Sequence, residues 1–160
     1  GATSAKHPGT QAAWENAFSF VFPSLAGASV LFGVGLLDGS NLLTYEQILL
    51  DAEMAAMLRR LLSGIAFDAA AFALPLIEEL GPGGVYLDQQ HTVSHMRRAL
   101  SLPRLADRDS YDEWFHKGQP DRVSIARQKV QEILTSHEAP PLSTATQEAM
   151  AEVVQAYSRP

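Results

Sequence analysis

Cysteine is absent from this chain of 160 residues. Its absence excludes disulfide bonds, thiolate metal sites and a cysteine nucleophile, and it fits a cytoplasmic protein. Charged residues are also scarce, at 19%, and the formal net charge is −6. Lysine and arginine form no dense cluster, so we expect no nucleic-acid partner. Hydrophobic residues make up 46% of the chain, which is enough for a buried core and is not typical of a disordered tail.

Charge is missing altogether from residues 17–37, AFSFVFPSLAGASVLFGVGLL. A run of about 20 apolar residues is long enough to cross a bilayer. Here Pro23 and several serines and glycines dilute the hydrophobicity, and neither flank carries the positive charge that would orient a membrane span. The segment also lacks the basic region of a signal peptide. We therefore expect no membrane segment.

The uncharged run is better interpreted as the end of a helix followed by a strand. Residues 11–26 are predicted to be helical, with Thr10 as the N-cap. Residues 29–37, SVLFGVGLL, lack polar alternation, which predicts a strand buried on both faces, as in a parallel sheet covered by helices. Gly33 and Gly35 fall on one face of that strand, where glycine marks the close approach of a ligand or another backbone.

The rest of the chain is predicted to be helical. Capping boxes, in which a Ser or Thr and a Glu or Gln three residues later cap each other's backbone, begin three of the helices. In the first of these helices an apolar face at helical spacing, from Ile48 through Ala52 and Leu58 to Leu62, is predicted to point inward. The expected helices are residues 44–63, 67–80 with an interruption near Pro75, 88–100, 110–116, 121–137 and 144–157, with capping boxes at Thr44–Gln47, Ser110–Glu113 and Thr144–Gln147.

A single strand cannot form a sheet. Either the domain is nearly all helical, or residues outside this chain complete the sheet. Residues 1–9 are polar and rich in turn-forming residues, like a loop that follows a missing strand, and there is no initiator methionine. We therefore expect the chain to be a fragment of a longer protein.

Short blocks of residues then point to a family. They are Thr3–Lys6, Gln11–Glu15, Leu25–Ala28, Gly35–Asp38, Tyr45–Gln47, Asp51–Glu53, His91 and Thr92 with His95 and Arg97, Pro103–Arg108, Tyr111 with Trp114, and Glu138–Leu142. In this order they resemble the C-terminal third of the trimethylamine methyltransferase family. That family comprises corrinoid-dependent methyltransferases and includes glycine betaine methyltransferases.

The resemblance implies an α/β fold, a (β/α)8 barrel roughly three times as long as this chain. This chain would be a C-terminal fragment, mostly helical with one or two parallel strands. Residues 1–100 would supply the last barrel units, and residues 101–160 a helical extension that packs on the barrel. A barrel strand also explains burial on both faces of residues 29–37.

The resemblance further implies that a methyl group moves from a methylamine or a quaternary amine, such as trimethylamine or a betaine, to a corrinoid. The corrinoid (cobalamin) would be carried by a cognate corrinoid protein, so this chain would bind no cofactor tightly, and it would form a homo-oligomer. The reaction needs a cation pocket that excludes water, built from aromatic faces and carboxylates. A catalytically inert helical interaction or oligomerisation domain is the alternative.

Active sites of such barrels lie at the C-terminal ends of the strands. The residues that the resemblance places there or near the corrin are candidates for contact with substrate or corrin, although none is assigned a catalytic role. They are Thr3, Ser4, Lys6, Gly33, Gly35, Asp38, Tyr45, Glu46 and His91.

Most candidates also have a structural interpretation. Lys6 either pairs with a substrate carboxylate or is a solvated loop lysine. Asp38 either contacts the cation or corrin or belongs to an Asp-Gly turn. The two glycines make room for the corrin or for packing. Tyr45 and Glu46 either reach the barrel mouth or only begin a capped helix.

His91 and His95 fall on one helical face, at a spacing that can hold zinc. No third ligand is evident, so we expect no metal, and we interpret His91 as structural or corrin-facing. Four arginines between residues 97 and 108 make a locally basic stretch. It would meet corrin propionates or an acidic partner, or it would be a solvated face paired at helix ends.

Overall fold

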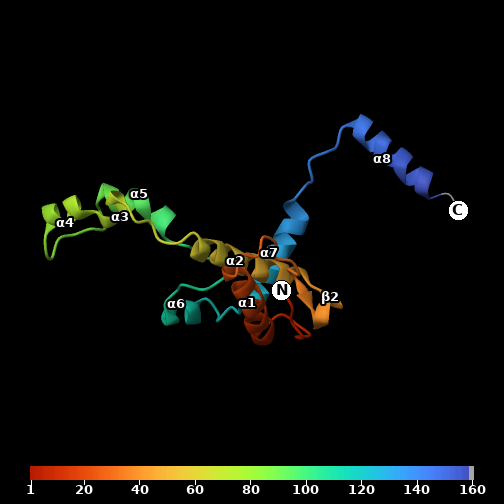
Figure 1. The fold of residues 1–160 in the computed structure, drawn as a ribbon. Helices are drawn as coiled ribbons and strands as arrows, with labels where there is room; N and C mark the ends of the chain where they lie inside the picture. The colour runs from red at the N-terminus through yellow and green to blue at the C-terminus, as the bar shows by residue number, and fades with distance from the viewer. Residues whose placement is uncertain (159–160) are drawn as a thin grey trace. The chain divides into compact units, whose positions relative to one another are not determined.

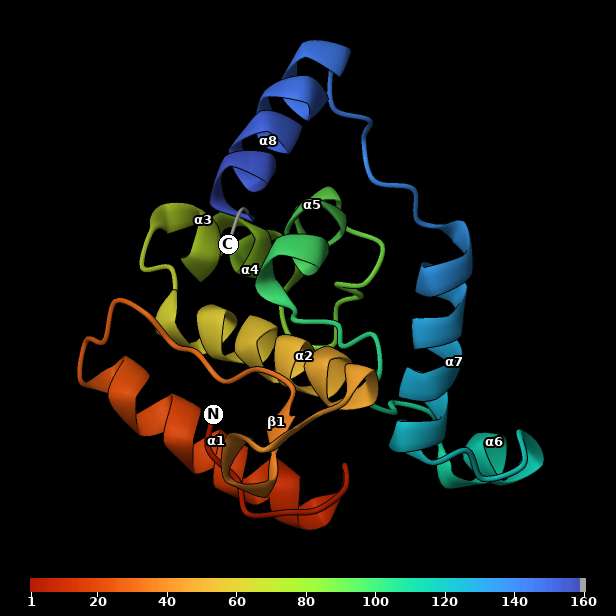
Figure 2. The same cartoon turned by 90° about the vertical axis from the view of Figure 1, so that its right-hand side faces the viewer.

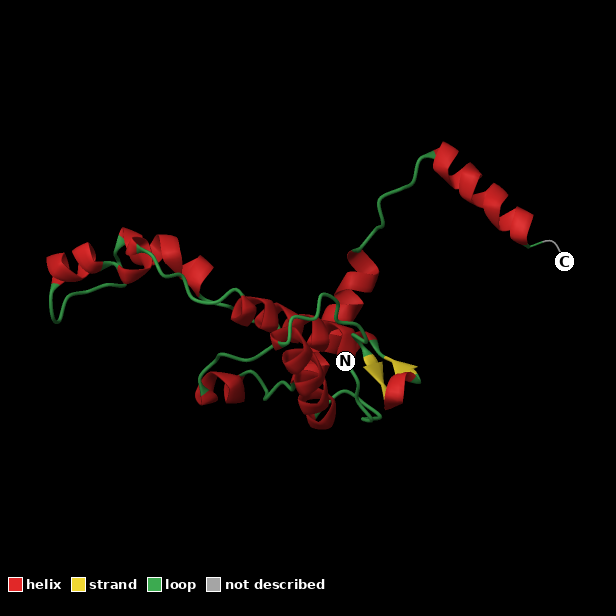
Figure 3. Ribbon diagram, in the orientation of Figure 1, coloured by secondary structure: helices red, strands yellow, loops and turns green. Residues whose placement is uncertain are grey.

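The computed structural model describes residues 1–158, which are mostly helical with one small two-stranded sheet (Figures 1 and 3). The chain divides into two compact units, Gly1–Val130 and Gln131–Pro160, and each is described by itself. The elements are α1 Thr10–Leu25, β1 Leu36–Leu37, the 3-10 turn η1 Asp38–Ser40, β2 Leu42–Leu43, α2 Tyr45–Leu62, α3 Ala69–Phe72, α4 Leu74–Leu80, α5 Gln90–Ala99, α6 Tyr111–His116, α7 Arg122–Ser136 and α8 Thr144–Tyr157. No described helix combines the length and the apolar content that crossing a membrane requires.

Side-chain caps explain where several helices begin. Thr44 accepts a hydrogen bond from the Gln47 N–H at α2, and Ser110 forms the complete predicted capping box at α6. The predicted caps of α1 and α8 are wrong by one residue. Thr10 lies inside α1, after an N-cap glycine that offers no side chain, and α8 is capped by Ser143.

The predicted helix 67–80 is divided in two. Ala73 has a φ of 50°, in the left-handed region, and it separates α3 from α4. Pro75 falls in the first turn of α4, where a missing N–H leaves no helical hydrogen bond unmade. The interruption predicted from this proline is therefore confirmed, with the break two residues before it.

The core of the first unit forms where α1 packs against α2, side by side in Figure 2. Phe20 of α1 is 1% exposed and Leu58 of α2 is 5% exposed. Burial of a side chain as large as Phe20 contributes on the order of 1.5–3 kcal/mol to stability. Ala5, Ala12 and Leu37 form a buried hydrophobic cluster that brings the first residues of the chain against α1 and β1.

The predicted strand over residues 29–37 is wrong except at its last two residues. Only β1 is a strand, and it pairs antiparallel with β2, with Leu36 opposite Leu43 and Leu37 opposite Leu42. Val30 and Phe32, predicted to be buried, are 77% and 83% exposed. Two features explain the difference. The described residues include no strand that could form hydrogen bonds with residues 29–35, and the positive φ angles of Gly33 (92°) and Gly35 (82°) depart from an extended backbone.

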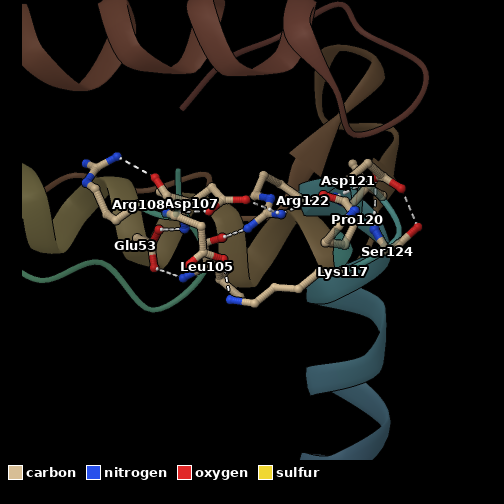
Figure 4. A network of polar contacts seen from close by, with 12 residues as sticks. Glu53, Leu105, Asp107, Arg108, Lys117, Pro120, Asp121, Arg122 and Ser124 are labelled. Atoms are coloured by element: carbon tan, nitrogen blue, oxygen red, sulfur yellow. Dashed lines mark hydrogen bonds and ion pairs between the residues drawn. The ribbon is translucent and has the colours of Figure 1, made fainter. Parts of the chain in front are cut away.

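A polar network fixes the loop between α5 and α6 against α2 (Figure 4). The Glu53 carboxylate accepts hydrogen bonds from the backbone N–H groups of residues 104, 105 and 106, at 2.6, 2.6 and 2.7 Å. Arg122, at the start of α7, donates to the Leu105 carbonyl oxygen at 2.9 Å and pairs with Asp107 at 3.0 Å. This network ties α2, the loop and the start of α7 together.

The second unit holds the end of α7 and all of α8. Four larger apolar side chains of α8 recur at intervals of one, three and four residues, so they share one face. They are Met150, Val153, Val154 and Tyr157, which are 55% to 88% exposed.

Candidate functional site

Two loops that contain candidate residues lie side by side in the first unit. The backbone N–H of Asp38 donates to the Ala5 carbonyl oxygen and the N–H of Gly39 donates to the Thr3 carbonyl oxygen, both at 2.9 Å. The Lys6 ammonium forms an ion pair with the Asp38 carboxylate across 32 residues of sequence. The structure therefore brings together two of the loops that carry candidate residues, those of Lys6 and Asp38.

The Glu15 carboxylate of α1 holds the first of these loops in place by hydrogen bonds. It accepts hydrogen bonds from the Thr3 hydroxyl at 2.6 Å, from the Ser4 N–H at 2.8 Å and from the Gln11 amide at 3.0 Å. These bonds, with that of Thr3 the largest, lower the pKa of Glu15. Thr3 is 4% exposed, so its hydroxyl supports the loop and does not face solvent.

The Lys6–Asp38 pair is open to solvent, with side chains 68% and 39% exposed. Asp38 has a φ of 49° and starts the η1 turn, in agreement with its interpretation as a turn residue. Exposed ion pairs contribute about 0–1 kcal/mol to stability. Each partner can therefore be exchanged for a charged group of a ligand at little energetic cost.

Gly35 is fixed by backbone geometry. Its N–H donates to the Asp51 carboxylate at 2.8 Å, and its carbonyl oxygen accepts from the Thr44 N–H at 3.1 Å. A Cβ atom at Gly35 would lie 2.3 Å from Cγ1 of Ile48. In this structure the glycine is therefore required by its positive φ and by the close approach of α2.

A buried polar cluster lies directly behind Gly35, and the sequence analysis did not identify it. Asp51 is 1% exposed and accepts from the Asn16 amide nitrogen at 3.0 Å and from the Gln47 amide nitrogen at 2.7 Å. The two amide groups are themselves buried, and their oxygen atoms have no hydrogen-bond partner among the described residues. The carboxylate orients both amides, because it can only accept hydrogen bonds.

The cluster also corrects the predicted inner face of α2. The buried residues of α2 are Gln47, Asp51 and Leu58, whereas Ala52 is exposed and Leu62 is 48% exposed. The prediction is confirmed at Leu58, but Gln47 and Asp51 are buried in place of Ile48 and Ala52, so the first half of the buried face is turned by about one residue, or 100°, from the predicted one. The signal in the sequence was the pair Gln47 and Asp51, four residues apart on one face. The helix was predicted from its apolar residues alone.

Tyr45 and Glu46 are the first two residues of α2. They lie close to Gly35, because the N–H of the preceding residue, Thr44, donates to the Gly35 carbonyl oxygen. Tyr45 is 57% exposed. Glu46 accepts from the Arg127 guanidinium of α7 at 3.0 Å, and this hydrogen bond is the main cause of its lowered pKa. Glu46 is therefore held in an ion pair that joins α2 to α7, whereas the Tyr45 side chain is exposed to solvent.

His91 is separate from the loops. Its Nε2 atom lies 2.6 Å from the carbonyl oxygen of Ala70 in α3, and its ring stacks on that of His95 with centroids 4.1 Å apart. No hydrogen bond or ring contact among the described residues links it to the other candidates. Within residues 1–158, no group of three His, Cys, Asp or Glu side chains is arranged to hold a metal ion.

Comparison with known proteins identifies a class of methyltransferases. A family model for trimethylamine methyltransferase (MTTB) matches residues 1–159. The chain therefore belongs to the trimethylamine methyltransferase family, as the resemblance predicted.

Curated relatives agree with this assignment. The chain is 33% identical over 143 residues to a glycine betaine methyltransferase of Desulfitobacterium hafniense (strain Y51), an alignment that covers 89% of this chain and 30% of the relative. It is 32% identical over 142 residues to trimethylamine methyltransferase MttB2 of Methanosarcina mazei, covering 86% and 28%. The chain thus spans less than a third of the length of these relatives.

Proposed function

We propose that this chain forms part of an enzyme that transfers a methyl group from a methylated amine to a corrinoid carried by a separate protein. The observation that carries the proposal is the family match over residues 1–159, with relatives named for trimethylamine and for glycine betaine. The corrinoid is here the methyl acceptor, a substrate of the reaction. We further propose that the enzyme works in the cytoplasm as a homo-oligomer.

We propose that the chain supplies the C-terminal part of a (β/α)8 barrel. The relatives are more than three times as long as the part that matches, which leaves room for the other barrel units. The exposed Val30 and Phe32 side chains would then be covered by those units. Covering each would contribute on the order of 1.5–3 kcal/mol.

The Lys6–Asp38 pair suits a zwitterionic amine such as a betaine. The ammonium would bind the substrate carboxylate, and the Asp38 carboxylate would face the quaternary nitrogen. A quaternary nitrogen has no N–H to donate, so its binding depends on charge and on cation–π contact, for which the exposed Tyr45 ring is available. Trimethylamine carries no carboxylate and would leave Lys6 without a role.

The demethylation of a quaternary amine needs little acid–base catalysis from the protein. The bond between the quaternary nitrogen and the methyl carbon breaks, and its electron pair stays on nitrogen, which leaves as a neutral tertiary amine. The cobalt of the corrinoid, in its Co(I) state, supplies the electron pair of the new bond to carbon and is oxidised to Co(III). The chain's residues would bind the cation, orient it and exclude water.

A chimera tests the proposal. In it, residues 1–159 replace the matching C-terminal segment of the glycine betaine methyltransferase of D. hafniense. With Co(I) corrinoid, we expect NMR to show conversion of glycine betaine to dimethylglycine, and we expect Lys6→Ala to raise KM for the betaine. A folded chimera that demethylates neither glycine betaine nor trimethylamine would contradict the proposal.

A helical oligomerisation domain is the second candidate, because α8 exposes an apolar face formed by Met150, Val153, Val154 and Tyr157. This function predicts that the chain self-associates and that Val153→Glu with Val154→Glu makes it monomeric. Light scattering after size exclusion measures both. A wild-type chain that is monomeric at high concentration would exclude this candidate and leave the methyltransferase proposal untouched.

A further inference from the structure

Arginine is concentrated at one place in the first unit. Six of the nine arginines in the chain occur in the last turn of α2, in the last turn of α5 and in the loop that follows α5. We call them the arginine surface. They are Arg59, Arg60, Arg97, Arg98, Arg104 and Arg108.

Hydrogen bonds bring these three segments together. The Arg60 guanidinium donates to the Ala99 carbonyl oxygen at 3.0 Å and to the Gly64 carbonyl oxygen at 2.9 Å, which joins the end of α2 to the end of α5. The Glu53 carboxylate holds the backbone of Arg104 beside α2. Glu53 and Arg60 are seven residues apart, or about 10 Å along the helix. The arginines therefore share one region of the surface.

The positive charge of this region is not neutralised within the described chain. No ion pair involves any of the six arginines among residues 1–158, and all except Arg60 are exposed. Three nearby carboxylates are engaged elsewhere, Glu53 by three backbone N–H groups, Asp107 by Arg122 and Asp109 by Lys117. Helix dipoles account for arginines in the last turns of α2 and α5, but Arg104 and Arg108 lie outside any helix.

Apolar side chains are exposed on the same helix ends and loop, and they are aliphatic. They are Met57, Leu61, Leu62, Met96, Leu100 and Leu102, which are 46% to 74% exposed. Arginine and methionine are enriched in protein–protein interfaces, and Arg anchors are common among the residues that dominate binding. Single-stranded nucleic acid instead requires aromatic rings on which bases stack.

We propose that the arginine surface docks an acidic segment of a partner protein that also carries aliphatic side chains. Charge complementarity fixes the sign of the partner, because this surface is positive on a chain of net charge −6. The exposed aliphatic side chains of this surface indicate that the partner segment also carries leucine-like side chains, because the two sets would be buried against each other. This inference does not depend on methyl transfer.

The test measures fluorescence anisotropy of the chain with a labelled peptide of glutamates and leucines, with poly-glutamate and with single-stranded DNA. We expect Arg97→Glu with Arg98→Glu to weaken binding of the peptide about tenfold or more. The control, Gln128→Glu with Gln131→Glu, adds negative charge at two exposed positions of α7 and leaves the Glu46–Arg127 ion pair intact. Circular dichroism checks that each variant is folded.

A second pair of variants tests the aliphatic part. Leu100→Ser with Leu102→Ser should weaken binding of the glutamate–leucine peptide but not of poly-glutamate. Four results would overturn the proposal: no binding by the wild-type chain, equal weakening by the control, DNA that binds as tightly as the peptide, or Leu100→Ser with Leu102→Ser leaving binding of the glutamate–leucine peptide unchanged.

Discussion

Two aspartates, both linked to the segment around Gly35, have opposite surroundings. Asp51 is 1% exposed and accepts hydrogen bonds from two amides and one backbone N–H. The Asp38 side chain is 39% exposed and pairs with a lysine that is itself 68% exposed. The buried carboxylate has no mobile partner, whereas the exposed one can change partners.

The difference separates a structural role from a binding role. Hydrogen bonds to a buried charge are strong, and removing the charge leaves buried donors unsatisfied. An exposed pair is weakened by water and salt, so its removal costs little. We therefore expect stability to depend on Asp51 and ligand binding to depend on Asp38.

Replacing Asp51 with alanine should have the largest effect. It would leave the buried amide nitrogens of Asn16 and Gln47 and the Gly35 N–H without an acceptor. We expect a loss of about 3–5 kcal/mol in the free energy of unfolding. Urea unfolding followed by circular dichroism measures it, with Asp38→Ala as the matched control. Equal losses in the two variants would remove the distinction between them.

Gly35→Ala should have the second largest effect. The new Cβ would meet Ile48 at 2.3 Å, and the positive φ of 82° disfavours any side chain. We expect a loss of about 2–4 kcal/mol from both causes. In an Ile48→Ala background the clash is relieved and only the cost of the left-handed backbone remains, about 1–2 kcal/mol. A double-mutant cycle separates the two, and a coupling near zero would show that Ile48 is not the obstacle.

The sequence was sufficient for the helices, because their signals are local. Capping residues such as Ser110, apolar spacing and glycine at helix ends act within a few residues of each other, and α2, α6 and α7 were predicted nearly to the residue. The prediction of a strand over residues 29–37 failed because the hydrogen bonds of a strand depend on a neighbouring strand. An uncharged segment such as 29–37 shows that burial is possible, but not which neighbour provides it.

The candidate site was predicted in part for the same reason. The family blocks located the loops of Lys6 and Asp38, which the structure places in contact. The supporting carboxylates, Glu15 and Asp51, were not identified as such, because each has only one partner four residues away and its other partners are 11 to 35 residues away in sequence. Only tertiary structure brings those donors together.

Thr3→Val tests the supporting role of Glu15 with a smaller effect. Loss of the Thr3 hydroxyl should raise the pKa of Glu15 toward its usual value, because this hydrogen bond is the largest cause of its lowering. A carboxylate with a lowered pKa stabilises the fold above its ordinary pKa, and that contribution is lost as the pH falls through the lowered value. Carbon-13 NMR titration of Glu15 measures the shift. Thr3→Ser keeps the hydroxyl and should leave the pKa low.

Lys6→Ala should change stability least, by less than about 1 kcal/mol, because the pair it breaks is exposed. High salt should reduce even this difference, whereas it should leave the loss in Asp51→Ala nearly unchanged, since buried charges are screened much less. Urea unfolding of both variants at low and high salt makes the comparison. A large, salt-independent loss in Lys6→Ala would show that the ion pair holds the two loops together, and its role as an exchangeable contact for a zwitterion would then be untenable.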